Sequence, residues 1–449
     1  MDITPDDANR IYARFSLAGY HEHVHRQRLE IDGLDGSQGT ITVDPANPNG
    51  FAVTGASAVN TLRDEYETHR NLITQLGGEH QLGKFKLEWL ASYVRATYDK
   101  PYDINSTFSG PGDGSNPAAG FNATYDNITN SNFPVLKVAG VDLANPSNYI
   151  LKKVGNSAEY DKDQEYSYQA KVSGPVGLLD GDNFAVGAKL RYREKYALKA
   201  SSANVKGIGQ SLTSFLGNGP YTNYYDGLYN IGYSANGDAI TSTFGSALAV
   251  HALGQADTLF DDHEDIIAGF VQYQATVGKL HGLIGVRVEH TKASYGGFVN
   301  GAYQTIASSY TNAFPTAQLR YEISPKLIAR GTWSTGIARP GFLQTIQSGS
   351  VDLGGQVVTT GNPYLKPTTS NNFDLSLEYY LPNAGVISVG LFDKQMRNYI
   401  IASTFRAPYP LSGVEQPVHV AIVQQCLGRL CAGRRAVVCQ QIHHAASPL

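Results

Sequence analysis

Tyrosines and short amide side chains gather between Pro220 and Tyr233, where the sequence reads PYTNYYDGLYNIGY. Rings that join an apolar body to a polar tip, set beside asparagines, are typical of binding surfaces. They would suit sugar faces or planar chelates, although a loop that packs its own tyrosines would have the same composition. The candidate ligand-binding residues are Tyr221, Tyr224, Tyr225, Tyr229 and Tyr233.

Charged residues form a second candidate set, because they recur at every other position of several segments. On a β-strand such residues point to one face, and charges of both signs on one face suit the wall of a water-filled interior. We expect these side chains to have a structural pairing role rather than to contact a ligand. The set consists of Arg191, Arg193, Arg287, Glu289, Arg320, Glu322 and Arg330.

Three patterns resemble metal ligands weakly, and we predict no metal site or cofactor from them. His21, His23 and His25 would lie on one face of a strand, about 6.8 Å apart, where neighbours can share an ion. Solvated histidines near a loop are the simpler interpretation. Carboxylate oxygens in Asp261 to Asp265 would suit calcium, but a solvated run of charges is the simpler interpretation there too. The remaining candidates match no common zinc spacing; they are Cys426, Cys431, Cys439, His443 and His444.

Composition excludes several classes of protein. The 449 residues carry a formal net charge of −4 and no basic block, so nucleic acid is not an expected partner. No run of 18 apolar residues is present, which argues against a membrane-spanning helix. No nucleophile elbow, P-loop or HExxH motif occurs, and we expect no enzyme. The N-terminus, MDITPDDANR, has no secretory signal pattern.

The elements that must position these residues are strands, because apolar and polar residues alternate in many segments. In Phe184 to Arg193 one face carries no charge and the other carries three. Roughly five or six hairpins are predicted in this way. The alternating segments are residues 11–17, 85–93, 184–193, 267–289, 317–334 and 373–391.

The connections between these strands are unequal in length. Turns within hairpins are short, whereas residues 100–163, 198–263, 291–314 and 335–371 are predicted to be long loops. Short turns on one rim and long loops on the other are typical of outer-membrane barrels. The sequence therefore predicts an all-β fold, an antiparallel transmembrane β-barrel with lipid outside and a polar lumen inside; a soluble β-sandwich is the alternative.

Four segments have amino-acid sequences that extend this interpretation. STGIARPGF (residues 334–342) and TTGNPYLKPTTSNNFDLSLEYYLPNAGVISVGLFDKQMRNYI (residues 359–400) resemble the late-barrel region of TonB-dependent outer-membrane receptors. EDIIAGFVQYQ and GLIGVRVEHT, in residues 264–291, are similar to a mid-barrel hairpin of that family. The triplet that is usually Thr-Arg-Pro begins here with Ala338. The resemblance covers roughly residues 10 to 403.

The resemblance implies a 22-stranded barrel with an N-terminal plug, and ligand uptake driven by the inner-membrane TonB complex. The charged set would then face the lumen and pair with the plug. We expect residues 1–403 to be a fragment of such a barrel, without the plug, and residues 404–449 to be an atypical tail, disordered or frameshifted.

The expected function is that of an outer-membrane receptor of a Gram-negative cell for a scarce solute, such as an oligosaccharide or a ferric siderophore. Expected partners are outer-membrane lipid, the ligand, and the TonB complex through the missing N-terminal region. A passive porin-like channel and a surface adhesin that acts through its loops are the alternatives.

Overall fold

Antiparallel strands make up most of the computed structural model. It describes residues 1–45, 47–127, 132–179, 181–250, 258–299, 302–345, 350–352, 357–381, 385–411 and 414–426. Twelve strands follow one another through the main sheet in chain order. These are β1 (Asp2–Asp6), β2 (Asn9–Asp32), β4 (Asn47–Leu82), β5 (Phe85–Ser109), β8 (Ile150–Gly174), β9 (Asn183–Ser201), β11 (Thr258–Val277), β12 (Leu280–Val299), β13 (Ala302–Ser324), β14 (Leu327–Ala338), β17 (Thr368–Tyr380) and β18 (Val386–Arg397).

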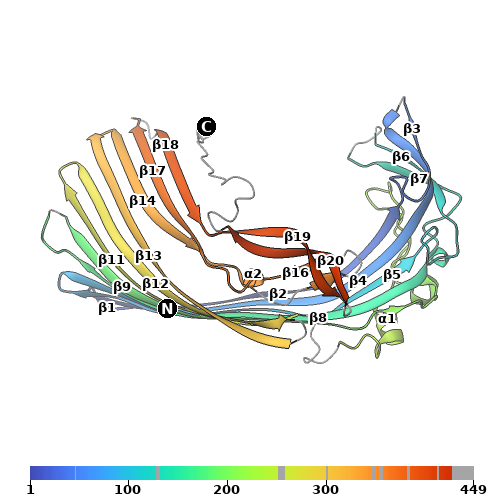
Figure 1. The fold of residues 1–449 in the computed structure, drawn as a ribbon, viewed down its shortest axis with the longest axis horizontal. Helices are drawn as coiled ribbons and strands as arrows, with labels where there is room; N and C mark the ends of the chain where they lie inside the picture. Colours follow the sequence, from blue (N-terminus) through green and yellow to red (C-terminus); the bar gives the residue numbers. More distant parts are fainter. Residues whose placement is uncertain are drawn as a thin grey trace.

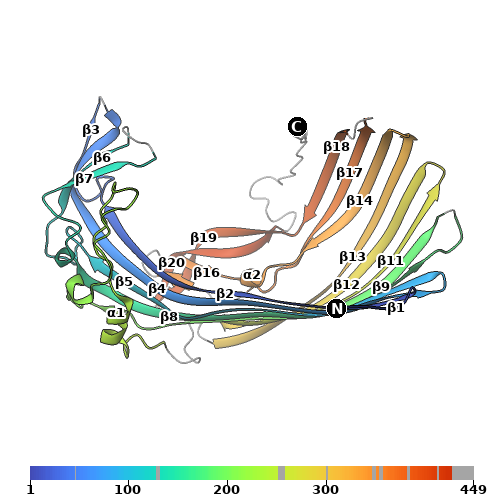
Figure 2. The ribbon, with the colours of Figure 1, turned by 180° about the vertical axis from the view of Figure 1, so that it is seen from behind.

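The sheet is strongly curved and remains open (Figures 1 and 2). Among the described residues, strand pairing runs from β1 to β18 without a ladder that joins these two ends. The predicted all-β antiparallel architecture is confirmed, as a partial barrel.

Turn lengths separate most of the strand ends into two rims, and the short β12–β13 connection is an exception at the second rim. Two-residue connections join β4 to β5, β11 to β12 and β13 to β14 at one rim. Long connections join β5 to β8, β9 to β11 and β14 to β17 at the other, which we call the long-loop rim.

The loop predicted over residues 291–314 is wrong. Pairing between β12 and β13 continues without interruption from Leu280↔Tyr321 to Val299↔Ala302. Polar residues such as Lys292 and Ser309 face each other there, so the hydrophobic alternation that reveals a half-buried strand is weak, although the ladder persists.

The two faces of the sheet differ in the way that the alternation predicted. On one face large apolar side chains are exposed, as shown by Val271 at 50% and Ile284 at 61%. Along β9 this apolar band extends from Phe184 to Tyr192, and the next residue on that face, Glu194, pairs with Lys162 of β8. The band is thus about nine residues long, the length that a tilted strand needs to cross a bilayer.

The longest connection, between β9 and β11, packs against that same face beyond the apolar band. It contains β10 (Val205–Lys206), the 3-10 helix η2 (Leu212–Phe215) and helix α1 (Gly237–Phe244). Phe215 and Ile240 are fully buried there with Phe108 and Leu151 of the strands beneath. Figure 1 shows α1 on the convex side, below β5 and β8.

Short elements complete the long-loop rim and the interior. β3 (Ile41–Asp44), β6 (Phe121–Asp126) and β7 (Val135–Ala139) extend β4, and the 3-10 helix η1 (Pro146–Asn148) precedes β8. On the concave side lie helix α2 (Phe342–Thr345) and a second sheet in the order β15-β16-β20-β19 (Figure 1). Its strands are β15 (Ser350–Asp352), β16 (Val357–Thr360), β19 (Tyr399–Leu411) and β20 (Val414–Cys426).

The predicted domain boundary at residue 403 falls within β19, which pairs with β20 as far as Cys426. Cys431, Cys439, His443 and His444 lie outside the described residues. The boundary and the nature of the tail stay predictions. No helix of the described part is long and apolar enough to cross a membrane.

Asp182 holds the turn between β8 and β9. Its carboxylate accepts hydrogen bonds from the backbone N–H groups of residues 176–179, at 2.7–3.2 Å, and from the Tyr273 hydroxyl at 3.1 Å. The Gly177 N–H and its neighbours lower the pKa of Asp182 well below its usual value, because they stabilise the charged form.

A pH-dependent loss of stability is expected from Asp182. A folded pKa below the unfolded value of about 3.9 stabilises the fold above that pH, and the stabilisation disappears as pH falls toward the folded pKa. We expect Asp182→Asn to lower the urea midpoint of the chain in detergent micelles at pH 7 more than at about pH 3. Other carboxylates titrate in the parent and in the variant alike, so they do not affect the difference between the two proteins. An equal loss at both pH values would therefore contradict a role for the Asp182 charge.

Candidate functional site

The concave face of the sheet carries cross-strand ion pairs. Arg191 of β9 donates two hydrogen bonds to Glu165 of β8, at 3.0 and 2.6 Å. Arg193, two residues further along the same face, makes the same bidentate contact with Asp163, at 3.0 and 2.5 Å. Such paired forks are the strong form of a charged hydrogen bond, so this part of the wall is electrostatically compensated.

The other predicted lumen residues are also paired within the sheet. Arg287 contacts Glu289 at 2.6 Å and Arg320 contacts Glu322 at 2.5 Å, each along its own strand. Arg330 of β14 contacts Glu378 of β17 at 2.9 Å. The structure thus places all seven predicted side chains in ion pairs of the wall; a plug as their further partner stays a prediction.

Arg339 is a member of this charged wall that the sequence pattern did not reveal. Its guanidinium reaches Glu289 of β12 and lies 3.9 Å from Glu264 of β11. Both carboxylates are largely buried, with side-chain exposures of 12% and 9%. The signal available in the sequence was the Ala-Arg-Pro triplet, but its partners lie 50 or more residues earlier in the chain.

The segment that follows Arg339 lies against the same wall. The guanidinium carbon of Arg193 stands over the ring of Phe342, 4.9 Å from its centroid, and the Lys195 ammonium is 5.9 Å from it. Cation–π contacts of this kind stabilise by about 0.5–2 kcal/mol. Residues 339–345, which we call the inner strap, therefore bridge β9, β11 and β12 from the concave side.

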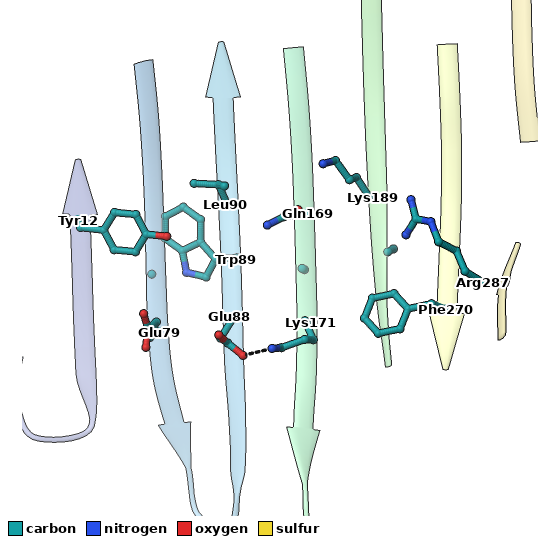
Figure 3. Close-up of a pocket in the computed structure, with 13 residues that line it drawn as sticks. Tyr12, Glu79, Glu88, Trp89, Leu90, Gln169, Lys171, Lys189, Phe270 and Arg287 are labelled. Carbon is teal, nitrogen blue, oxygen red and sulfur yellow. Dashed lines mark ion pairs between the residues drawn. The ribbon is translucent and has the colours of Figure 1, made fainter. Parts of the chain in front are cut away.

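Nearer the short-turn rim, the wall is hollowed by a shallow pocket of about 300 Å³ (Figure 3). Seven strands, from β2 to β12, supply its lining. Glu88 and Lys171 form an ion pair of 2.5 Å across it. Tyr12 and Phe270 stand on opposite sides (Figure 3). The lining combines charges of both signs with aromatic rings. Such a pocket suits contact with an uncharged polar surface better than the binding of a single ion.

The predicted tyrosine cluster lies elsewhere, in the connection between β9 and β11. Tyr229 donates its hydroxyl proton to the Pro134 carbonyl at 2.7 Å, and the Tyr225 ring packs on Phe133, with centroids 5.1 Å apart. The backbone carbonyl of Tyr233 accepts a hydrogen bond from the Gln27 amide at 2.6 Å. Figure 2 shows this yellow-green segment at the long-loop rim, away from the inner strap.

Several of these tyrosine rings remain accessible to solvent. Tyr221, Tyr224 and Tyr225 are 39%, 51% and 56% exposed. The loop thus packs some of its tyrosines and presents others, and ligand binding by the cluster stays a prediction.

Comparison with known proteins identifies the family. The model of the family described as TonB dependent receptor-like, beta-barrel, matches residues 19–416. The chain belongs to the TonB-dependent receptor family. Members of this family are receptors and transporters of the outer membrane rather than enzymes.

Two solved receptors match most of this chain, at low sequence identity and with low TM-scores. The hemophore receptor HasR of Serratia marcescens is 11% identical, with a TM-score of 0.38, and the match covers 94% of this chain and 55% of HasR. The siderophore receptor PiuA of Acinetobacter baumannii is 9% identical, with a TM-score of 0.41, and the match covers 92% of this chain and 55% of PiuA. The chain thus spans about half the length of these receptors. No curated protein matches it in sequence.

Proposed function

We propose that this chain is the wall of an outer-membrane receptor that takes up a scarce solute with energy from the TonB complex. The observation that carries the proposal is the division of one curved sheet into an apolar convex face and an ion-paired concave face, within a family match over residues 19–416. A wall of this kind separates lipid from a polar lumen.

The pairing of the lumen charges fits a wall against which another domain moves. Isolating a buried charge is strongly unfavourable, so a plug held by unpaired wall charges would be expensive to displace. Here Arg191 and Arg193 already have carboxylate partners on β8. A plug can therefore leave this surface without leaving an isolated charge behind, as energy-coupled transport requires.

The ligand we propose is an oligosaccharide or a ferric siderophore, captured at the long-loop rim by the tyrosine cluster. The exposed rings of Tyr221, Tyr224 and Tyr225 support this assignment. Aromatic rings pack on the apolar faces of sugar rings and of chelating groups alike, so the shared chemistry is a partly apolar ligand face.

Uptake assays in the organism that encodes the chain test this function. Labelled ferric siderophores and oligosaccharides would be supplied to the parent strain, to a strain without this gene, and to one without the TonB complex. We expect accumulation of one ligand to be lost in both mutants. Accumulation that is lost without the gene but retained without the complex would indicate a passive channel. A defect in surface attachment alone would indicate an adhesin.

A further inference from the structure

Two histidines and one aspartate converge on the outer side of β2 and β4, beyond the apolar band. His23 and His25 lie two residues apart on β2, so their side chains share one face. Asp64 of β4 is directly opposite His25 in the ladder. The ligand atoms of the three residues all lie within 4.8 Å of one another.

Both imidazoles point at the same carboxylate oxygen. Nε2 of His23 is 2.9 Å from Oδ1 of Asp64, and Nε2 of His25 is 3.7 Å from it. Tetrahedral coordination at zinc bond lengths places ligand atoms about 3.3 Å apart. The two observed separations bracket that value, and all three ligand atoms lie within 4.8 Å of one another. Both imidazoles are about half exposed, so their rings have room to rotate.

The carboxylate is fixed in place by the long connection above it. Asp64 is only 4% exposed. A Cβ on Gly237, the first residue of α1, would stand 1.8 Å from its second oxygen, Oδ2, which shows how closely the helix covers Asp64. The amides of Gln27 and Asn60 donate to the Tyr233 carbonyl at 2.6 and 3.4 Å and anchor the connection beside this point.

We propose that His23, His25 and Asp64 bind a divalent transition-metal ion of the Zn²⁺ class. Two imidazoles and a carboxylate are the ligands that such ions prefer. Three protein ligands leave a position for water or an external ligand on the solvent side. The Tyr102 hydroxyl, 3.3 Å from Nε2 of His23, is close enough to contact that position. The bound ion would link β2 to β4 beside the start of α1.

The His21 side chain provides a matched control. It lies on the same strand and the same face, two residues before His23, but it is not one of the three converging residues. His21 instead stacks on Tyr66, with ring centroids 6.0 Å apart. His21→Ala therefore removes a neighbouring imidazole without removing a proposed ligand.

Zinc titration of the full chain tests the proposal. The chain would be purified in detergent without a polyhistidine tag, stripped with a chelator, and titrated with ZnCl₂ alone. We expect His23→Ala and Asp64→Asn each to remove one bound equivalent, or to weaken it roughly tenfold or more, while His21→Ala matches the parent. Unchanged stoichiometry and affinity in the double variant His23→Ala/His25→Ala would overturn the proposal.

Cobalt substitution gives a readout that does not depend on the variants folding well. Co²⁺ at a site of two imidazoles and one carboxylate is expected to give visible ligand-field bands without a thiolate charge-transfer band. A thiolate band would place the ion on the cysteines of the C-terminal segment and would overturn the assignment. The absence of any ligand-field band above that of free Co²⁺ would also overturn it.

Discussion

Replacing Arg339 with methionine is expected to destabilise the folded chain by about 3–5 kcal/mol. The methionine keeps much of the side-chain volume but removes the charge that lies between Glu289 and Glu264. Glu264 is 7% exposed, so the change leaves its carboxylate buried without the cation of the inner strap, while Glu289 keeps its contact with Arg287. The free energy of unfolding by urea in detergent micelles at pH 7 measures the loss.

Arg330 provides the control for this prediction. It also pairs with a glutamate of the wall, Glu378 at 2.9 Å, but 41% of its side chain is exposed. Exposed ion pairs contribute at most about 1 kcal/mol, so Arg330→Met is expected to have a small effect. In the double variant Arg339→Met/Glu264→Gln part of the loss should be recovered. Equal losses for the two arginine variants would show that the inner strap does not depend on its buried charges.

The strand faces were predictable from the sequence because the period of a strand is two residues. Alternation in residues 184–193 separates Val186, which is 45% exposed on the convex face, from Arg191 on the concave face. Predicting the two faces required no knowledge of which strands are neighbours, because every strand that crosses a membrane turns apolar residues to lipid and polar residues to water. Beyond the apolar band this constraint ends, so the sequence of residues 291–314 does not predict the pairing that the structure shows there.

The side-chain clusters were only partly predictable, because they depend on which distant segments meet. The spacing predicts only that His21, His23 and His25 share a strand face, whereas Asp64 is brought to two of them by the β2–β4 register. Arg339 similarly meets Glu289 through a strap that leaves β14 and crosses the sheet. Spacing along the chain predicts that residues i and i+2 share a strand face, but it does not predict these long-range contacts. The tyrosine cluster shows the converse, since its composition indicated a binding surface but not its place at the rim.

A charge placed on the convex face tests whether that face meets lipid. Val271 lies in the middle of the outward-facing residues of β11, which run from Ile267 to Val277, and it is 50% exposed. We expect Val271→Arg to cost about 2–4 kcal/mol, the cost of an arginine on the lipid face near the bilayer midplane. The measurement is the free energy of unfolding of the chain from lipid vesicles.

Gln272, the next residue of β11, provides the control for this prediction, because its side chain lies on the opposite face. Because successive side chains alternate, Gln272→Arg places the same charge at the same depth on the concave face, where Arg287 and Lys189 already line the shallow pocket of Figure 3. Water or another polar surface can solvate it there, so we expect a change of well under half the Val271→Arg effect. A larger loss of unfolding free energy for Gln272→Arg than for Val271→Arg would show that the concave, ion-paired face contacts lipid. Equal losses would mean that neither face contacts lipid at this depth, which would remove the basis for a membrane-spanning wall.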